Sequence, residues 1–88
     1  MTGDYAAAAV AYERVVAAYT QALGARHVST LDAKVGWASS LAASGRAAQA
    51  LPLLEEAAPA LAAQLGAEDP SAVFAQRELD YTRQDLGR

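Results

Sequence analysis

The sequence predicts an all-α fold, an antiparallel helix-turn-helix solenoid of about four helices in a single domain over residues 1–88. The main observation is a repeat of forty-two residues, because Leu23-Gly24-Ala25 returns as Leu65-Gly66-Ala67. Alanine-rich segments of helical length lie between regularly spaced glycines, and no segment alternates polar and apolar residues as a strand would. A fixed period of this size indicates stacked supersecondary units that bury a core between neighbours.

The first helix is expected over residues 4–23, with Thr2 or Asp4 as its N-cap. Its apolar side chains recur at steps of three or four residues, which places them on one helical face. They are Tyr5, Ala8, Val15, Val16, Tyr19 and Leu23.

The second helix is expected over residues 29–44. Ser29 followed by Asp32 resembles a capping box, and Gly45 fits a C-terminal stop. Large and small apolar residues step along one face, namely Leu31, Val35, Ala38 and Leu41, with Trp37 beside them.

The third helix is expected over residues 47–65 and contains Pro52 and Pro59. Each proline removes one backbone hydrogen bond, but seven residues apart they lie on nearly the same side, so we expect a bend and not two breaks. The fourth helix, over residues 70–86, should begin at Asp69-Pro70, an N-cap followed by proline at the first helical position.

Composition excludes several classes of function. The net charge is −3 and the Lys and Arg residues are scattered, whereas nucleic-acid binding needs a clustered positive face. Without cysteine there is no disulfide or thiolate metal site. No apolar run has the length of a membrane span and no signal-peptide pattern follows Met1, so we expect a cytoplasmic protein with no membrane partner.

The combined spacing resembles the tetratricopeptide repeat family, in the forty-two-residue form of kinesin light chain and of large bacterial signalling and regulatory proteins. Two positions depart from the family pattern: Val28 stands where it has Pro, and Ala47 where it has Tyr. The residues that carry the resemblance are Leu23-Gly24, His27, Thr30-Leu31, Ala33, Trp37-Ala38, Leu41, Gly45-Arg46, Ala50-Leu51, Glu55, Ala57, Leu65-Gly66 and Asp69-Pro70.

The resemblance implies a groove lined by the first helix of each unit, which would hold a peptide or protein partner. Carried over to this sequence, the binding positions are Asp32, Val35, Ser39, Phe74, Arg77, Glu78 and Tyr81. Phe74 and Tyr81 would make apolar contacts, and Arg77 would pair with a carboxylate. The alternative is that these positions form an ordinary solvated helix face.

In the family register this chain reads as half a unit, a whole unit and half a unit. Asp80 and Arg83 would then form a solvated terminal face. The first helix would instead keep apolar surface that a preceding helix normally covers, which marks an interface or a truncation. We therefore predict a self-association surface at Tyr5, Tyr12, Val16 and Tyr19.

No constellation of catalytic residues stands out. His27 is the only histidine and has no apparent metal partners, adjacent Glu55 and Glu56 diverge on a helix, and no serine has a His–Asp arrangement. Trp37 is expected in the core. The sequence thus predicts a non-enzymatic interaction module without metal or cofactor, a repeat fragment of a larger bacterial protein. Two alternatives stay open: self-association through unpaired terminal helices, and a small-ligand-sensing repeat domain.

Overall fold

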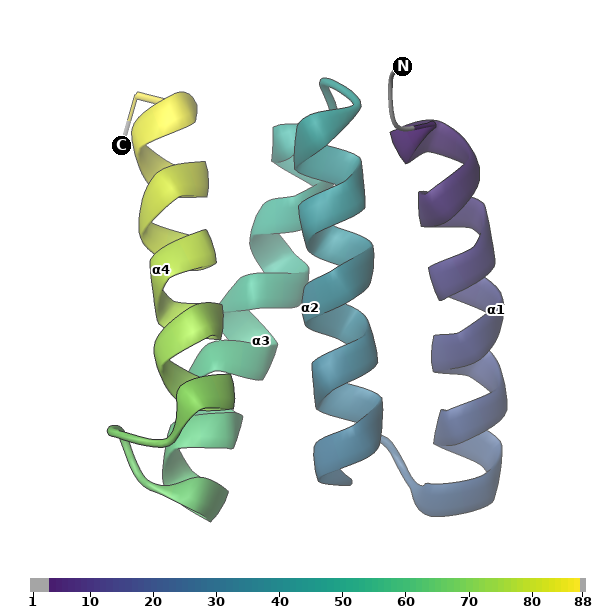
Figure 1. The fold of residues 1–88 in the computed structure, drawn as a ribbon, viewed down its shortest axis with the longest axis vertical. Coiled ribbons are helices and arrows are strands. Elements are labelled where there is room, and N and C mark those ends of the chain that lie inside the picture. The colour runs from purple at the N-terminus through teal and green to yellow at the C-terminus, as the bar shows by residue number, and fades with distance from the viewer. Residues whose placement is uncertain (1–3, 88) are drawn as a thin grey trace.

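The computed structural model describes residues 4–87 and contains four helices joined by short turns (Figure 1). These are α1 (Tyr5–Leu23), α2 (Val28–Ala43), α3 (Ala47–Leu65) and α4 (Pro70–Asp85). Successive helices run in opposite directions, and each begins and ends within one residue of its predicted range. The all-α fold class is confirmed. Thr2, the second capping residue considered for the first helix, lies outside the described residues.

Side-chain caps start three of the helices. Asp4 Oδ1 accepts from the Ala7 backbone N–H at 3.0 Å, as expected for α1. Asp69 Oδ1 likewise accepts from the Ser71 N–H at 2.9 Å, and Pro70 takes the first helical position. Each cap satisfies a donor that the first turn leaves without an intrahelical acceptor.

The predicted start of α2 was wrong by one residue. His27, and not Ser29, is the N-cap, and its Nδ1 accepts from the Ser29 N–H at 3.0 Å. Ser29 already lies inside the helix, so the proposed capping box with Asp32 does not form there. His27 and Asp69 are forty-two residues apart, which means that the repeat preserves the capping geometry with a different side chain.

Glycine ends α2 as predicted. Gly45 has a φ of 88°, which an L side chain rarely adopts, and it follows the C-cap residue Ser44. The Arg46 N–H then donates to the Leu41 carbonyl at 2.8 Å and the Gly45 N–H to the Ala42 carbonyl at 3.1 Å. This pair of bonds is the Schellman arrangement, which satisfies the last carbonyls of the helix.

The two prolines do not interrupt α3. The helix continues from Ala47 to Leu65, and both Pro52 and Pro59 lie on its exposed side. The missing N–H groups and the displaced carbonyls therefore face water, where solvent can replace the lost hydrogen bonds.

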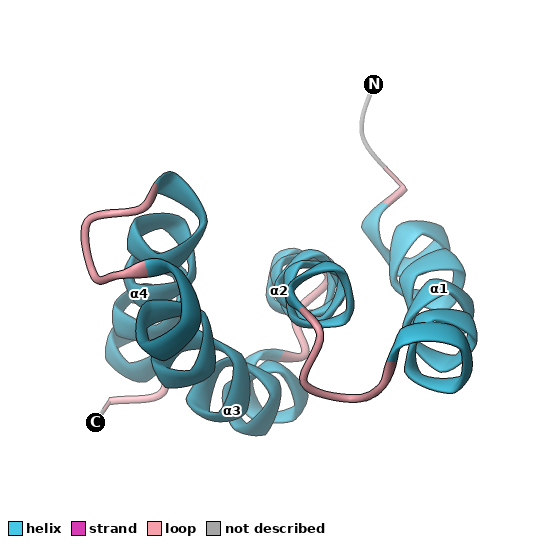
Figure 2. Ribbon diagram, turned by 90° about the horizontal axis from the view of Figure 1, so that it is seen from below, coloured by secondary structure: helices cyan, strands magenta, loops and turns pink. Residues whose placement is uncertain are grey.

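The helices pack in chain order. α2 packs between α1 and α3, α3 packs between α2 and α4, and α2 also touches α4. Figure 2 shows α4, α2 and α1 in a row with α3 on one side of that row. The centre of the core lies where α2, α3 and α4 meet, at Leu31, Val35, Ala38, Leu41, Leu54, Ala57, Leu61, Ala75 and Leu79. Trp37 is only partly buried at the margin of this cluster, so its expected place in the core holds in part.

α2 and α4 differ in how many of their faces are apolar. The positions of Val35, Ala38 and Leu41 in the core face of α2 are taken in α4 by Arg77, Asp80 and Arg83, forty-two residues later. Asp80 is exposed, and Arg83 reaches back to Glu55 of α3 at 3.7 Å with both side chains nearly half exposed. The expected polar face at the end of the array is therefore present on α4.

Within residues 4–87, no helix combines the length and the apolar character needed to cross a lipid bilayer.

Candidate functional site

Three adjoining hollows lie on the side of the molecule formed by α4, α2 and α1, which faces the viewer in Figure 1. The first hollow, of about 390 Å³, spans all three helices. Asp32, Val35 and Gly36 of α2 form its floor. It is bordered by Tyr12 of α1 on one side and by Pro70, Ser71 and Phe74 of α4 on the other.

The second hollow, of about 220 Å³, lies further towards the C-terminal ends of α2 and α4. Ala42 contributes from α2, and Glu78, Tyr81, Thr82 and Asp85 contribute from α4. Between the two hollows the Ser39 hydroxyl donates a hydrogen bond to Glu78 Oε1, which ties α2 to α4. We call the first and second hollows together the α2–α4 groove.

The third hollow, of about 340 Å³, lies between α1 and α2 and shares Tyr12 and Asp32 with the first. We call it the α1 seat. Its α1 side consists of apolar or aromatic side chains, and its α2 side is more polar. Its lining residues are Tyr12, Val15, Tyr19, Ser29, Asp32 and Ala33.

The ring of Tyr12 in α1 lies directly against Gly36 in α2. A Cβ atom placed on Gly36 would lie 2.5 Å from Tyr12 Cε1, far inside van der Waals contact. The absence of a side chain at Gly36 therefore lets the phenol ring lie across the backbone of α2. This contact brings Tyr12, which we predicted as part of a separate self-association surface, to the edge of the predicted groove.

Asp32 is the carboxylate common to the α2–α4 groove and the α1 seat. Partial burial raises its pKa above the ordinary value of 3.8, and the nearby carboxylate of Asp69 raises it further. A hydrogen bond with the Ser71 side chain lowers the pKa and opposes part of this rise. The ionised form of Asp32 is thus insufficiently compensated, so a cation brought to this point would stabilise it.

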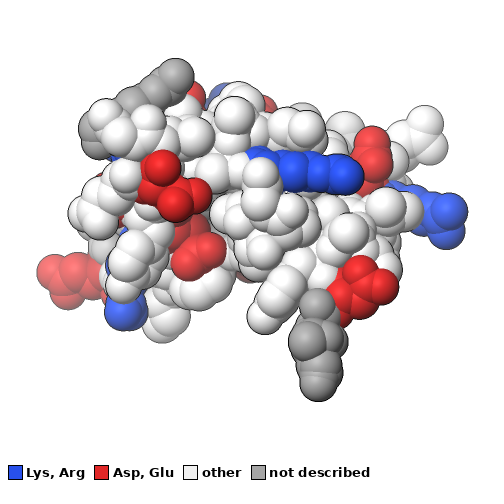
Figure 3. Space-filling view, turned by 90° about the horizontal axis from the view of Figure 1, so that it is seen from above, with Lys and Arg blue, Asp and Glu red and all other residues white. Residues whose placement is uncertain are grey.

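The charged side chains that line the three hollows are all acidic. They are Asp32, Glu78 and Asp85, and no Lys or Arg among residues 4–87 lines any of the three. Arg77, the predicted carboxylate partner, lies instead with Asp80, Tyr81 and Gln84 in a hollow made by α4 alone. Figure 3 shows acidic side chains gathered at the left, over the C-terminal part of α4.

The predicted groove residues come together apart from Arg77. Asp32, Val35 and Phe74 share one hollow, Glu78 and Tyr81 share another, and Ser39 reaches Glu78 between them. The small-ligand alternative called for Arg77, Tyr81 and Asp32 around one pocket, but Arg77 and Asp32 line different hollows.

The predicted self-association residues do not share one environment. Tyr5, Tyr12 and Tyr19 are exposed, whereas Val16 is buried in the interface with α2 and offers no surface. Val15, next to it in the chain, was placed on the apolar face of the first helix but not among the self-association residues, and it is exposed. The repeat does not separate the two positions, because Ala57 and Ala58, forty-two residues after Val15 and Val16, both lie in the core.

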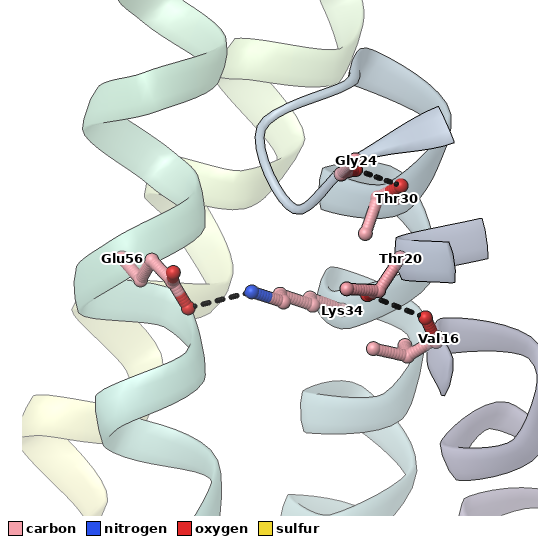
Figure 4. Close-up of polar contacts among 6 residues, drawn as sticks. All are labelled: Val16, Thr20, Gly24, Thr30, Lys34 and Glu56. Carbon is pink, nitrogen blue, oxygen red and sulfur yellow. Dashed lines mark hydrogen bonds and ion pairs between the residues drawn. The ribbon is translucent and has the colours of Figure 1, made fainter. Parts of the chain in front are cut away.

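The buried polar contacts away from these hollows hold helices in place. Lys34 of α2 is buried and its Nζ pairs with Glu56 Oε1 of α3 at 2.8 Å (Figure 4). The Thr30 hydroxyl donates to the Gly24 carbonyl at 2.8 Å, which fastens the α1–α2 turn to α2. Glu56 thus has a structural partner, as expected for a surface charge. Residues 4–87 contain no group of three His, Asp or Glu side chains that could hold a metal ion.

Comparison of the chain with protein-family models, curated proteins and solved structures finds no match. The tetratricopeptide resemblance therefore stays a prediction, which depends on the residues and spacing given in the sequence analysis.

Proposed function

We propose that this protein is a non-catalytic interaction module that binds a segment of a partner protein in the α2–α4 groove. The observation that carries the proposal is the chemistry of that groove. Exposed aromatic rings lie beside carboxylates, and no Lys or Arg lines the groove among the described residues. Phe74 and Tyr81 are among the most exposed large apolar side chains of the described chain. Aromatic anchors beside charged groups are typical of surfaces that bind other proteins.

The charge of the groove favours a basic partner. Asp32, Glu78 and Asp85 follow its length, and a Lys or Arg opposite each carboxylate would add charge-assisted hydrogen bonds. Each 16-residue helix is about 24 Å long, which an extended segment of about seven residues would span. The tetratricopeptide resemblance supports the same location, since it assigns the groove to these two helices.

A peptide-binding measurement tests this proposal. The probes are two fluorescein-labelled, amidated heptapeptides, one alternating Lys with Phe and the other alternating Glu with Phe. We expect saturable binding of the Lys peptide that weakens as salt rises, because exposed charges are screened. Backbone NMR shifts should map to Ser39, Phe74 and Tyr81. Binding of the Glu peptide with equal affinity would contradict the basic partner, and the absence of shifts with either peptide would contradict the groove.

A matched pair of variants tests the role of the groove carboxylates. Glu78→Gln with Asp85→Asn removes two groove charges, and Glu13→Gln with Glu68→Gln removes two exposed charges elsewhere. We expect the first pair to weaken the Lys peptide by about threefold to tenfold and the second to leave it nearly unchanged. Equal effects of the two pairs would mean that only net charge matters.

Self-association through α1 is the second candidate function. The observation that favours it is the exposed row of Tyr5, Tyr12, Val15 and Tyr19. Tyr19→Glu tests it more cleanly than Tyr12→Glu, because Tyr12 also supports the α1–α2 contact at Gly36. Light scattering across a range of concentrations should show a larger mass that this substitution abolishes, and a constant monomer mass would end this candidate.

A further inference from the structure

The α1 seat has an internal counterpart elsewhere in the fold. The residues forty-two positions after its lining residues are Leu54, Ala57, Leu61, Ser71, Phe74 and Ala75. These belong to α3 and α4 and surround the place where α2 packs. Phe74 is exposed, and the other four apolar members are fully buried, at Leu54, Ala57, Leu61 and Ala75. The counterpart on α3 and α4 is therefore occupied by α2, whereas the α1 seat is open.

The exposed fractions of equivalent side chains show how completely the α1 seat differs from its counterpart on α3 and α4. Tyr12 is 38% exposed and Tyr19 is 39% exposed, whereas Leu54 and Leu61 at the equivalent positions are 0% exposed. The side of α1 that packs on α2 is already closed, since Val16 and Ala9 are buried. The apolar surface at Tyr12, Val15 and Tyr19 that stays open corresponds to the side on which α3 receives α2.

We propose that the α1 seat binds one amphipathic helix of a partner protein, in the position that α2 takes on α3 and α4. This inference rests on the proposed function, that the protein binds a partner protein. It adds that the part of the partner bound at α1 is a helix. The occupant needs small and aliphatic residues at helical spacing towards the tyrosines, as α2 presents Leu31, Val35 and Ala38 to the core. It gains by burying aromatic area that is now in contact with water.

The polar side of the seat determines one further feature of the partner. Asp32 is the equivalent of Phe74, which lines a hollow together with positions 32, 35 and 36 of α2. The occupant's residues at those three positions would therefore lie near Asp32. A Lys or Arg there would pair with this carboxylate, and an acidic residue would be repelled.

The terminal helix of a second copy does not fit these requirements. The face of α4 equivalent to Val35, Ala38 and Leu41 carries Arg77, Asp80 and Arg83. Packing that face on the tyrosines would remove three charges from water without designated partners. The α2 helix of a second copy is already buried between α1 and α3. Neither helix of a second copy therefore supplies the apolar face and the basic residue opposite Asp32 that the proposed partner helix would supply.

The test uses the 16-residue α2 sequence, Val28–Ala43, as a free labelled peptide carrying Asp32→Lys, with the unsubstituted peptide as its control. We expect the Lys-bearing peptide to bind the intact protein saturably at concentrations up to about 1 mM. The unsubstituted peptide should bind at least about threefold more weakly, because its aspartate would face Asp32. Backbone NMR shifts should centre on Tyr12, Val15 and Tyr19.

Two matched variants of the protein complete the test. Val15→Lys places a charge in the seat, and Val10→Lys places the same charge on an exposed part of α1 that lines no hollow. We expect Val15→Lys to weaken the peptide at least about tenfold, since the lysine would be buried beneath it, and Val10→Lys to have almost no effect. Circular dichroism should show that both variants remain helical.

Four outcomes would overturn the inference. One is equal weakening by Val15→Lys and Val10→Lys, and another is no saturation by either peptide. A third is a set of shifts confined to Glu78 and Tyr81, which would leave the proposed α2–α4 groove intact while removing the α1 seat. The fourth is a concentration-dependent rise in mass that Val15→Lys abolishes, which would identify the occupant as a second copy.

Discussion

α1 and α3 carry the same forty-two-residue pattern but meet different surroundings. α3 is covered by α2 on one side and by α4 on the other, and Leu54, Ala57 and Leu61 are completely buried. α1 is covered by α2 alone within residues 4–87, and its equivalent residues Tyr12, Val15 and Tyr19 are more than a third exposed. Sequence periodicity thus defines an apolar face, whereas the neighbouring helices determine whether that face is buried.

α2 and α4 show the opposite difference. These two helices also have different neighbours, but here their sequences differ accordingly. α4 carries polar residues on the face where α2 carries its core residues. The face of α4 that corresponds to the core face of α2 is therefore polar, whereas the surface left open on α1 is apolar. This asymmetry is why we place the partner helix at α1.

The largest expected effect compares Leu61 with its equivalent Tyr19. Leu61→Ala should lower the free energy of unfolding by about 2–5 kcal/mol, because it leaves a cavity in a fully buried site. Tyr19→Ala should cost well under half as much, since its ring already contacts water. Urea denaturation of both variants measures the difference. Equal losses would mean that the surface of α1 is covered in solution.

The next effect concerns the contact between Tyr12 and Gly36. Gly36→Ala should destabilise the parent by about 1–3 kcal/mol, because the new methyl group collides with the phenol ring. In a Tyr12→Ala background the same substitution should instead stabilise by up to about 1 kcal/mol, since alanine favours the helix more than glycine does. The measurement is a double-mutant cycle by thermal unfolding. The same sign in both backgrounds would contradict the collision.

A smaller effect separates the adjacent glutamates of α3. Glu56→Ala should cost about 1 kcal/mol, because it leaves the buried ammonium group of Lys34 without its partner at 2.8 Å. Glu55→Ala should cost less than about 0.5 kcal/mol, because its pairing with Arg83 at 3.7 Å is largely exposed. Chemical denaturation at low and moderate salt compares the two. A larger loss at Glu55 would reverse the assignment.

The smallest effect is the pH dependence due to Asp32. Its folded-state pKa lies above the ordinary 3.8, so the folded protein binds more protons at this site than the unfolded chain does. This contribution to stability is greatest below pH 3.8 and falls as pH rises through the folded-state pKa. Asp32→Asn should therefore remove a contribution to the free energy of unfolding that decreases as pH rises. The same substitution should slightly stabilise the protein at neutral pH. Identical pH profiles for the two proteins would contradict this prediction.

The affinity for a basic peptide should depend on the ionisation of Asp32 in the opposite direction from stability. A basic peptide pairs with the ionised form of Asp32, so its affinity should fall as the solution is made acidic. Asp32→Asn should weaken the peptide at neutral pH and flatten that pH dependence. An unchanged affinity would place the peptide away from Asp32.

Most of the local structure was predictable from the sequence. The repeat located all four helices, and Gly45 and Asp69-Pro70 marked their ends, because caps and glycine stops act within a few residues. The error at Ser29 arose because the Ser29 N–H, which the predicted capping box assigned to Asp32, donates instead to the His27 side chain. His27 lies two residues before Ser29 and therefore caps the helix. The identity of a capping side chain is a close competition between neighbours, which spacing alone does not decide.

The composition of the candidate site was less predictable. The resemblance supplied Asp32, Val35, Phe74, Glu78 and Tyr81, but it did not show that Arg77 lines a separate hollow of α4, which shares Tyr81 with the groove. Nor could it show that Tyr12 borders both the groove and the seat, because that depends on how closely α1 approaches Gly36. Adjacent positions such as Val15 and Val16 differ by about 100° around a helix, so which of the two is buried depends on how α1 is rotated against α2.

By itself, the sequence determined the helices, their turns, the forty-two-residue repeat and the polar end at α4. These follow from backbone hydrogen bonding, capping and side-chain periodicity, which act over one or two helical turns. The packing of the four helices then set which apolar face remained open, which charges met in the hollows and which tyrosine lay against a glycine. Burial and electrostatic compensation depend on side chains brought together from helices far apart in the chain.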